Sequence, residues 1–203
     1  MLYLAFIFIT YNQVQQIIYK MAILTKYLEN WNKIDTPYYI KKWIKEGVTI
    51  PFSTEPPPVE LENYISSSEE TKFIDNKLSD YLNEGYISEV LEKPRCISPL
   101  GCANKKGNEK YRLITDMRYV NQFIEVPKIR YEDLSNLPSI VQNNDLYASV
   151  DLKDGFNHVS LNKNIRKYFG FKWKNRYYVW NVLNFGCSMA PYLFTKILRP
   201  VLK

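Results

Sequence analysis

The sequence predicts an α+β fold, in which helices and short strands share one chain of 203 residues. Apolar residues recur at three- and four-residue intervals over 14–31, 73–82 and 193–201, as they do in amphipathic helices. Between 86 and 182, short runs of aromatic and β-branched residues are bounded by turn formers, which is typical of strands. With 46% hydrophobic and 24% charged residues, the composition is globular and excludes disorder, collagen and coiled coil as descriptions of the whole chain.

The first 63 residues divide into a helix and an arm. The apolar stripe over 14–31 predicts the helix. Five prolines fall within 35–63, and the run at 56–58 removes backbone donors and favours extended backbone, so we expect a linker or surface arm there. The eight apolar residues at 2–9 are too few for a membrane span, which needs about 20. We interpret them as the start of a strand or helix, with a signal sequence as the less favoured alternative because no small-residue cleavage pattern follows.

From residue 64 onward, local signals define the elements more sharply. Ser67 and Glu70 have the spacing of a capping box and Gly85 supplies a C-terminal stop, which together predict a helix between them. Lys174-Asn175 is suited to a hairpin turn, and Pro191 suits the first turn of a final helix. The expected strands are 86–91, 111–115, 146–151, 168–173 and 176–182.

The charge is distributed unevenly along the chain. The whole sequence has 27 Lys and Arg against 21 Asp and Glu, a formal charge of +6, but residues 93–203 hold 19 basic and 8 acidic side chains. A polyanionic partner should therefore meet this half, and a solvated basic face is the plainer alternative. The sequence has three cysteines and one histidine, too few for a framework of several disulfides. They do not have the paired spacing of zinc ligands, which excludes a zinc site. We therefore expect buried free thiols in a reducing compartment.

The first segment that carries chemistry is 150–156, an apolar strand that ends in Asp151 and is followed by Asp154, Gly155 and Phe156. A carboxylate at a strand end can hold a hard cation, because Mg²⁺ prefers oxygen ligands and usually takes one or two protein carboxylates beside phosphate oxygens. By itself the pattern is also ordinary turn chemistry, and the aromatic ring is also an ordinary core residue.

Two further segments add to this one. Lys105 and Lys106 belong to a basic, glycine-containing turn ahead of Arg112, and ammonium groups beside a planar guanidinium suit a triphosphate. A solvated hairpin tip is the alternative. Residues 183–191 leave a strand through Gly186 and enter a helix, so backbone with little side-chain bulk can lie against a flat base or sugar. Taken alone, this segment is also an ordinary strand-to-helix loop.

The order of these three segments resembles that in the reverse transcriptases of retroelements, with DIRS-like and Ty3-like retrotransposon polymerases as the nearest likeness. The likeness runs from about residue 28 to the end and includes "SVDLKDGFNHVSL" at 149–161 and "VLNFGCSMAPYLFTKILRPV" at 182–201. It implies a right-hand polymerase fold, with the fingers and the first part of the palm at 64–203 after an N-terminal helical and extended segment at 1–63. It also implies RNA-directed DNA polymerase activity, the templated transfer of deoxynucleotides to a primer 3′-hydroxyl.

The resemblance assigns roles to individual residues. Asp151 matches the family's first catalytic, metal-binding aspartate, and Leu152 would offer its backbone carbonyl to the same Mg²⁺. Phe156 matches the aromatic position that blocks a ribose 2′-hydroxyl and so selects deoxynucleotides. The residues expected to bind the incoming deoxynucleoside triphosphate (dNTP) are Lys105, Lys106, Arg112, Asp154, Gly155, Phe156, Phe185 and Gly186. Those expected near the templating base are Asp116, Arg118 and Asn121.

The resemblance is incomplete. The family completes its metal site with a Tyr-x-Asp-Asp hairpin, whereas no Asp or Glu follows Asp154 here. We therefore expect a chain truncated within its catalytic domain and inactive alone, with an RNA or DNA template-primer and dNTP as partners and a second chain as one source of the missing palm. Asn184 and Met189 also depart from the family pattern, which usually has proline and a small residue at these positions.

Two non-enzymatic alternatives stay open. A nucleic-acid-binding remnant would use the basic half of the chain and its aromatic residues to bind template and primer without chemistry. A domesticated scaffold without a nucleic-acid role has no positive sequence support. No membrane partner is expected, and the choice between cytoplasm and nucleus inside the cell is open because no cluster of about five basic residues marks a nuclear signal.

Overall fold

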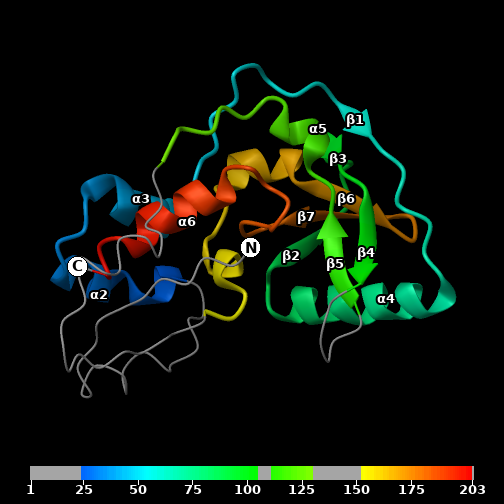
Figure 1. Cartoon of the computed structure of the whole chain (residues 1–203), viewed down its shortest axis with the longest axis horizontal. Helices are drawn as coiled ribbons and strands as arrows, with labels where there is room; N and C mark the ends of the chain where they lie inside the picture. The colour runs from blue at the N-terminus through cyan, green and yellow to red at the C-terminus, as the bar shows by residue number, and fades with distance from the viewer. Residues whose placement is uncertain (1–23, 105–110, 130–151, 203) are drawn as a thin grey trace, which may run out of the picture.

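A computed structural model describes residues 24–104, 111–129 and 152–202 of the chain. Figure 1 shows a central sheet, a separate two-stranded hairpin, and helices on either side of the strands. The mixture of helices and strands agrees with the predicted α+β class. The described residues do not include the apolar run at 2–9, the first part (14–23) of the helix expected over 14–31, or the strand expected at 146–151.

Five short strands make the main sheet. They are β1 (Val59–Glu60), β2 (Ile87–Val90), β3 (Cys96–Ile97), β6 (Gly170–Trp173) and β7 (Arg176–Trp180). Their order across the sheet is β1-β3-β6-β7-β2. The pairs β1–β3 and β3–β6 are parallel, and the pairs β6–β7 and β7–β2 are antiparallel. Phe171 is fully buried and stacks on Tyr178 with ring centroids 5.2 Å apart, so the core lies against the central hairpin.

A second hairpin stands apart from this sheet. Its strands β4 (Leu100–Asn104) and β5 (Tyr111–Thr115) are antiparallel. The long helix α4 (Ser68–Asn83) contacts both strands and runs across their lower end in Figure 1. The register places Gly101 opposite Ile114, and the basic turn expected between the strands falls outside the described residues.

The predicted signals at both ends of α4 are confirmed. The Ser67 hydroxyl accepts a hydrogen bond from the backbone N–H of Glu70 at 3.2 Å, and the Ser67 N–H donates to the Glu70 carboxylate at 2.8 Å. Ile74 and Leu78 are buried, one helical turn apart. Gly85 has a φ of +74°, the left-handed conformation that commonly ends a helix. Local sequence therefore determines where this helix begins and ends.

Three of the expected strands are shorter than predicted, and β2 lacks one residue at each end of the expected range 86–91. β6 begins at Gly170 rather than at 168, because the preceding residues wind into a 3₁₀ helix, η4 (Lys163–Tyr168). β7 ends at Trp180 rather than at 182, because the chain beyond it pairs with 159–161 instead. The predicted turn between the strands is confirmed, with positive φ angles of 46° and 62° at Lys174-Asn175.

The segment expected to be an arm contains a helix, α3 (Tyr38–Glu46). Its Ile40 and Ile44 are buried one turn apart, and they form the apolar face by which it packs. The prediction of a linker over 35–63 is therefore wrong for this part. Prolines precede and follow this helix, and its apolar stripe is only nine residues long, so the local pattern favours an extended arm over a helix.

The helices before α3 are also short. The chain forms a 3₁₀ turn, η1 (Leu24–Tyr27), and then α2 (Leu28–Lys33). This replaces the end of the continuous helix expected over 14–31. Trp31 of α2 is buried, so the predicted apolar stripe does face the core at this point.

The end of α3 is fixed to the segment before η4. Gly47 has a φ of +84°, and a Cβ on it would fall 2.6 Å from the backbone nitrogen of Asn162. The Asn162 N–H donates to the carbonyl oxygen of Val48 at 2.9 Å. The side-chain amide of Asn162 donates to the backbone carbonyl oxygen of Glu46 at 3.0 Å. These contacts join the N-terminal helices to the rest of the described chain.

The proline run is extended, as predicted, and is bonded to the sheet. Arg95 Nε donates to the carbonyl oxygen of Pro56 at 2.8 Å, and the Val59 N–H donates to the carbonyl oxygen of Arg95 at 3.0 Å. Glu55 accepts a hydrogen bond from the Tyr168 hydroxyl at 2.6 Å. The domain boundary expected at residue 63 stays a prediction.

Three short elements complete the fold. They are α5 (Arg118–Asn121), η3 (Gly155–His158) and α6 (Ala190–Leu198). Helix α6 carries Pro191 in its first turn, as predicted, and contacts η3. Leu193 and Ile197, on the apolar face of α6, are buried.

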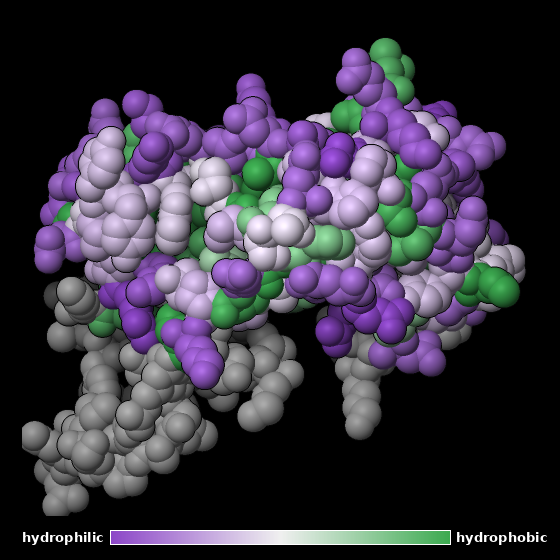
Figure 2. All heavy atoms as spheres, turned by 90° about the horizontal axis from the view of Figure 1, so that it is seen from above, coloured by the Kyte–Doolittle hydropathy of each residue, from purple (hydrophilic) through white to green (hydrophobic). Residues whose placement is uncertain are grey.

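The surface is mixed in character. Figure 2 shows the face seen from above, where hydrophilic residues cover most of the outline and hydrophobic residues gather along the middle. The three cysteines are free, as predicted: Cys96 and Cys187 are buried, and Cys102 is half-buried. Among the described residues, no helix combines the length and the hydropathy that a membrane span requires.

Gly47→Ala should lower the free energy of unfolding by about 3 kcal/mol, because alanine would have to keep a positive φ while its Cβ met the backbone of residue 162. The matched control is Gly85→Ala, where φ is also positive but no atom lies within 4 Å of the added Cβ, so a cost of about 1 kcal/mol is expected. Urea unfolding followed by circular dichroism measures both. Equal losses would contradict the close contact at the end of α3.

Candidate functional site

Three segments that are distant in the sequence meet in the fold. They are the end of β5 with α5, the residues at the start of η3, and the loop at 185–188 before α6. Asn121 of α5 is hydrogen-bonded to this loop, and Phe156 of η3 is in ring contact with it through Phe185. These are parts of the three segments in which the sequence predicts chemistry.

Gly186 lies against the end of β5. A Cβ on it would overlap the carbonyl oxygen of Thr115 and would fall 2.8 Å from Cγ of Met117. Glycine is needed here for close approach, because any side chain would push the loop away from the strand.

Asn121 stabilises the contact between this loop and the end of β5. Its Nδ2 donates to the carbonyl oxygen of Gly186 at 2.9 Å, and its Oδ1 accepts from the N–H of Ser188 at 2.9 Å. Both ends of the amide are thus bonded to the backbone of the loop. Asn121, predicted to lie near a templating base, therefore also holds the loop in place.

Three phenylalanine rings cluster where η3 meets the loop. The ring centroid of Phe156 lies 4.9 Å from that of Phe185 and 5.3 Å from that of Phe194. Phe185 is 62% exposed, whereas Phe156 is half-buried. The Phe194 ring also fills the space beside Gly155, where a Cβ would fall 2.8 Å from it. Phe156 therefore packs against the core and also borders the surface.

Asp154 precedes this cluster in a left-handed conformation with a φ of +53°, which aspartate adopts more readily than most residues. Its carbonyl oxygen accepts the N–H of Asn157 at 2.8 Å. Burial raises the pKa of Tyr81 to about 12, and the negative charge of Asp154 adds to the rise. Burial also raises the pKa of Tyr86 to about 12, with Glu84 and Asp154 adding to it. Neutral phenols therefore lie within the field of the Asp154 carboxylate.

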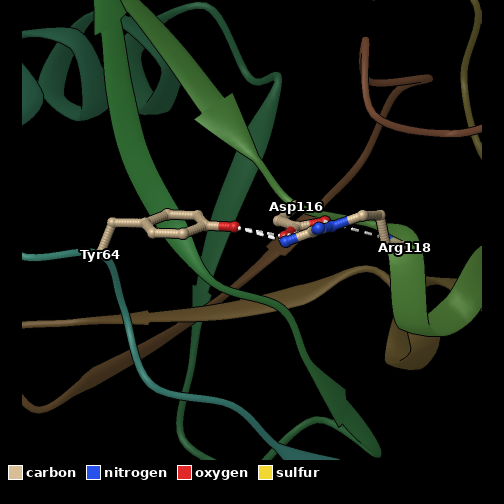
Figure 3. Close-up of polar contacts among 3 residues, drawn as sticks. All are labelled: Tyr64, Asp116 and Arg118. Atoms are coloured by element: carbon tan, nitrogen blue, oxygen red, sulfur yellow. Dashed lines mark hydrogen bonds and ion pairs between the residues drawn. The ribbon is translucent and has the colours of Figure 1, made fainter.

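A polar network joins Tyr64, Asp116 and Arg118, as Figure 3 shows. The Tyr64 hydroxyl donates to Oδ2 of Asp116 at 2.5 Å. Arg118 Nη2 donates to the same oxygen at 2.6 Å and to the Tyr64 hydroxyl at 2.9 Å, and Nε donates to both carboxylate oxygens at 2.9 Å. These donors, the guanidinium first, hold the pKa of Asp116 well below its usual range. The hydrogen bond to the carboxylate raises the pKa of Tyr64.

The network borders an open groove of about 450 Å³, which we call the β4–β5 groove. Gly101 and Ile114, opposite one another on the two strands, line it, and Gly186 closes one part of it. The side chain of Arg118 lines the groove and is 82% exposed. Arg112 is exposed two positions before Ile114, and alternation along a strand places both on one face of β5. The groove therefore combines an apolar floor with the exposed guanidinium of Arg118, and Arg112 lies farther along the same face of β5.

Some predicted site residues cannot be placed. Lys105, Lys106 and Asp151 lie outside the described residues, whereas Leu152 is described and half-buried. Within the described ranges, no group of three or more His, Cys, Asp or Glu side chains lies together as a metal site. The described side chains do not by themselves fit a Mg²⁺ ion, so the assignment of Mg²⁺ to Asp151 and Leu152 stays a prediction.

The segments that meet at this site fall within a known family. Residues 103–203 match the family model described as reverse transcriptase (RNA-dependent DNA polymerase). These residues belong to the reverse transcriptase family. The resemblance identified from the sequence is thereby confirmed at the level of the family.

Viral polyproteins are among the proteins similar to this chain. A polyprotein of cassava vein mosaic virus is 27% identical over 131 residues, which are 62% of this chain and 20% of the polyprotein. The genome polyprotein of petunia vein clearing virus is 31% identical over 106 residues, 49% of this chain and 5% of the polyprotein. The Gag-Pol polyprotein of walleye dermal sarcoma virus is 23% identical over 163 residues, 80% of this chain and 9% of the polyprotein. The chain thus spans only a small part of each relative, and the DIRS-like or Ty3-like subtype stays a prediction.

One departure from the reverse transcriptase pattern has a visible consequence. Asn184 is buried, and neither polar atom of its side chain has a hydrogen-bond partner in the described part of the chain. Burying an amide without a partner costs free energy. A proline, the usual residue of these retroelements at this position, would bring no polar side-chain atoms into the core.

Sequence reasoning missed two residues of this candidate site. Tyr64 lies in the extended chain between β1 and α4, and no spacing links it to Asp116. Phe194 belongs to the apolar stripe predicted for the last helix, but its contact with Gly155 depends on tertiary packing. Tyr64 is the one aromatic residue between Phe52 and Phe73, which is the sequence signal that points to it.

Asp116→Asn should destabilise the protein at neutral pH and lose its effect in acid. The pKa of Asp116 in the folded state lies below its ordinary value of 3.8, so protonation at low pH favours the unfolded chain. The stabilisation is complete above about pH 5 and is lost as the pH falls below about 4. Urea unfolding of both proteins across this range measures the difference. A difference that persists unchanged down to about pH 3 would contradict the network.

Proposed function

We propose that residues 64–203 form the fingers and the first part of the palm of a right-hand RNA-directed DNA polymerase. The reaction is the templated transfer of a deoxynucleotide from dNTP to a primer 3′-hydroxyl. The observation that carries this proposal is the meeting of three segments, in which Asn121 bonds the loop at Gly186 and Phe185 of that loop lies against Phe156. The family membership of residues 103–203 supports the same function.

The nucleotide would lie at the phenylalanine cluster. The exposed ring of Phe185 beside the half-buried ring of Phe156 offers an apolar surface to a sugar and base. Gly186 lets the backbone of the loop approach that surface closely. Phe156 would act as the gate, because its ring would collide with a ribose 2′-hydroxyl. The residues proposed to hold the triphosphate are Lys105, Lys106 and Arg112, and Asp154 and Gly155 would lie under the incoming nucleotide.

The template would lie along the β4–β5 groove. Arg118 is largely exposed there and is held by Asp116, and Asn121 joins the groove to the loop beside the nucleotide. Single strands bind proteins through positive charge along the backbone and flat side chains against the bases. A groove with an apolar floor and an exposed guanidinium suits that chemistry.

The reaction also needs Mg²⁺, which when bound would stabilise the attacking and leaving oxygens. The residues proposed to hold it are Asp151 and the backbone carbonyl of Leu152. No Asp or Glu follows Asp154 in the 203 residues. We therefore propose that these residues alone bind nucleic acid without extending a primer, and that the remaining carboxylates come from additional polypeptide.

The 203-residue chain should bind a primer-template hairpin with an affinity that falls steeply with salt, because basic residues of the 93–203 half would displace counterions from the phosphates. Arg118→Ala, which removes the exposed guanidinium of the groove, should weaken binding and reduce the slope of log Kd against log salt concentration by roughly one unit. Fluorescence anisotropy with a labelled hairpin measures both.

The matched control for Arg118 is Arg176→Ala, on β7. Arg176 is exposed and pairs with Glu89, and it does not line the β4–β5 groove. Its replacement should leave the salt slope unchanged. A wild-type chain that fails to bind at low ionic strength, or binds independently of salt, would contradict the proposed function.

Phe156→Val should raise ribonucleotide incorporation relative to deoxyribonucleotide incorporation, because the smaller side chain leaves room for a 2′-hydroxyl. The test uses a chimera in which residues 1–203 continue into the remaining palm and thumb of a related polymerase. The ratio of kcat/KM for the two nucleotide types is the measured quantity, since a change confined to the ratio reports contact with the sugar.

Phe194→Leu is the control for packing in the same cluster. Phe194 contacts Phe156 and Gly155, so its replacement should lower both activities together and leave the ratio unchanged. An unchanged ratio in a folded, active Phe156→Val chimera would remove Phe156 from the nucleotide site. A chimera that binds primer-template but never extends it would favour a binding remnant.

A further inference from the structure

We propose that Tyr64 is a positioning residue, which orients the Arg118 guanidinium toward a phosphate of the unpaired template strand in the β4–β5 groove. The inference rests on the proposed function for the choice of ligand. The geometry that points to it is the hydrogen-bond network of Tyr64, Asp116 and Arg118 in Figure 3.

The backbone of Tyr64 is held against β4. The Tyr64 N–H donates to the carbonyl oxygen of Leu100 at 3.1 Å. The side chain of the preceding Asn63 accepts from the Leu100 N–H at 2.9 Å and donates to the carbonyl oxygen of Lys172 at 2.8 Å. These bonds fix the extended segment 63–64 to both the hairpin and the main sheet.

The Tyr64 ring is fixed as well. A Cβ on Gly101 would fall 2.8 Å from Cδ2 of Tyr64, so the ring lies directly on the strand at a position where only glycine leaves room for it. This position of the ring brings the Tyr64 hydroxyl, at the far end of the side chain from the Tyr64 backbone, to the Asp116 carboxylate. A tyrosine whose backbone and hydroxyl are both hydrogen-bonded can hold a flexible neighbouring side chain in one orientation.

Arg118 is the flexible partner. Its side chain is 82% exposed, and an exposed arginine loses considerable rotamer entropy when it is held in one conformation. Here Nε and Nη2 are engaged by Asp116, and Nη2 also donates to the Tyr64 hydroxyl. Within the described residues, Nη1 donates no hydrogen bond. That nitrogen therefore remains available to a ligand oxygen.

The charges favour a phosphate as that ligand. Asp116 is only 11% exposed, and its oxygens are already bonded to Tyr64 and Arg118. The guanidinium is the exposed charge of the pair, and a planar guanidinium with free N–H groups is well suited to phosphate oxygens. Tyr64 acts through Arg118, since its own hydroxyl already donates to Asp116 and accepts from Arg118.

Tyr64→Phe tests the proposal, because it keeps the ring on Gly101 and removes only the hydroxyl. The probe is a labelled DNA hairpin with a single-stranded 5′ overhang, compared with the same hairpin without the overhang. We expect about fivefold weaker binding to the overhang hairpin and no change for the blunt one. The same substitution in an Arg118→Ala background should have no further effect, because the residue that it orients is absent.

Tyr168→Phe is the matched control. It removes the hydroxyl of another tyrosine bonded to a carboxylate, that of Glu55, outside the groove lining. It should leave the preference for the overhang unchanged. Equal binding by Tyr64→Phe and wild type would overturn the proposal, and so would a loss that persists in the Arg118→Ala background.

A second readout does not depend on nucleic acid. In ¹⁵N spectra of the free protein, solvent exchange of the Arg118 Nη2 protons should become faster in Tyr64→Phe and remain slow in Tyr168→Phe. Unchanged exchange would overturn the positioning role. If exchange changes as expected but wild type binds neither hairpin, Tyr64 positions Arg118 and the proposed function is wrong.

Discussion

The candidate site depends on the close approach of Gly186 to the carbonyl oxygen of Thr115, a contact that leaves no space for a side chain. It joins the loop before α6 to the end of β5, and Asn121 secures it with two hydrogen bonds. Because the loop is fixed there, Phe185 is brought over Phe156. One side of the loop thus borders the β4–β5 groove and the other the phenylalanine cluster.

This arrangement separates two tasks in space. The groove carries the charged network of Tyr64, Asp116 and Arg118, whereas the phenylalanine cluster is apolar and borders Asp154. The loop is the shared wall between them. A change that moved Gly186 would therefore disturb the proposed template and nucleotide contacts together, although neither depends on the side chain of this residue.

Local sequence signals predicted much of the fold. The capping box at Ser67, the stop at Gly85, the turn at Lys174-Asn175 and the proline at the start of α6 are all found where expected. Each of these depends on residues a few positions apart, so backbone chemistry alone determines them. The family motifs also predicted which distant segments would meet.

The rest depends on tertiary contacts that no local pattern reveals. Strands β1 and β3 have two residues each, too few to show alternation, and they exist because neighbouring strands pair with them. Helix α3 is short and lies between prolines, and its stripe is supported by packing and by the bonds of Asn162. Tyr64 reaches Asp116 only because Asn63 and Gly101 hold its segment on β4.

The proline run has a consequence for the assembly of the molecule. Among the described residues, the main sheet ends on one side at β1, which is two residues long and follows directly after Pro56, Pro57 and Pro58. Prolines have no N–H to donate, and a two-residue edge offers very few backbone groups to a newcomer. This edge therefore disfavours the addition of a strand from a second copy of the chain, and with it edge-to-edge aggregation.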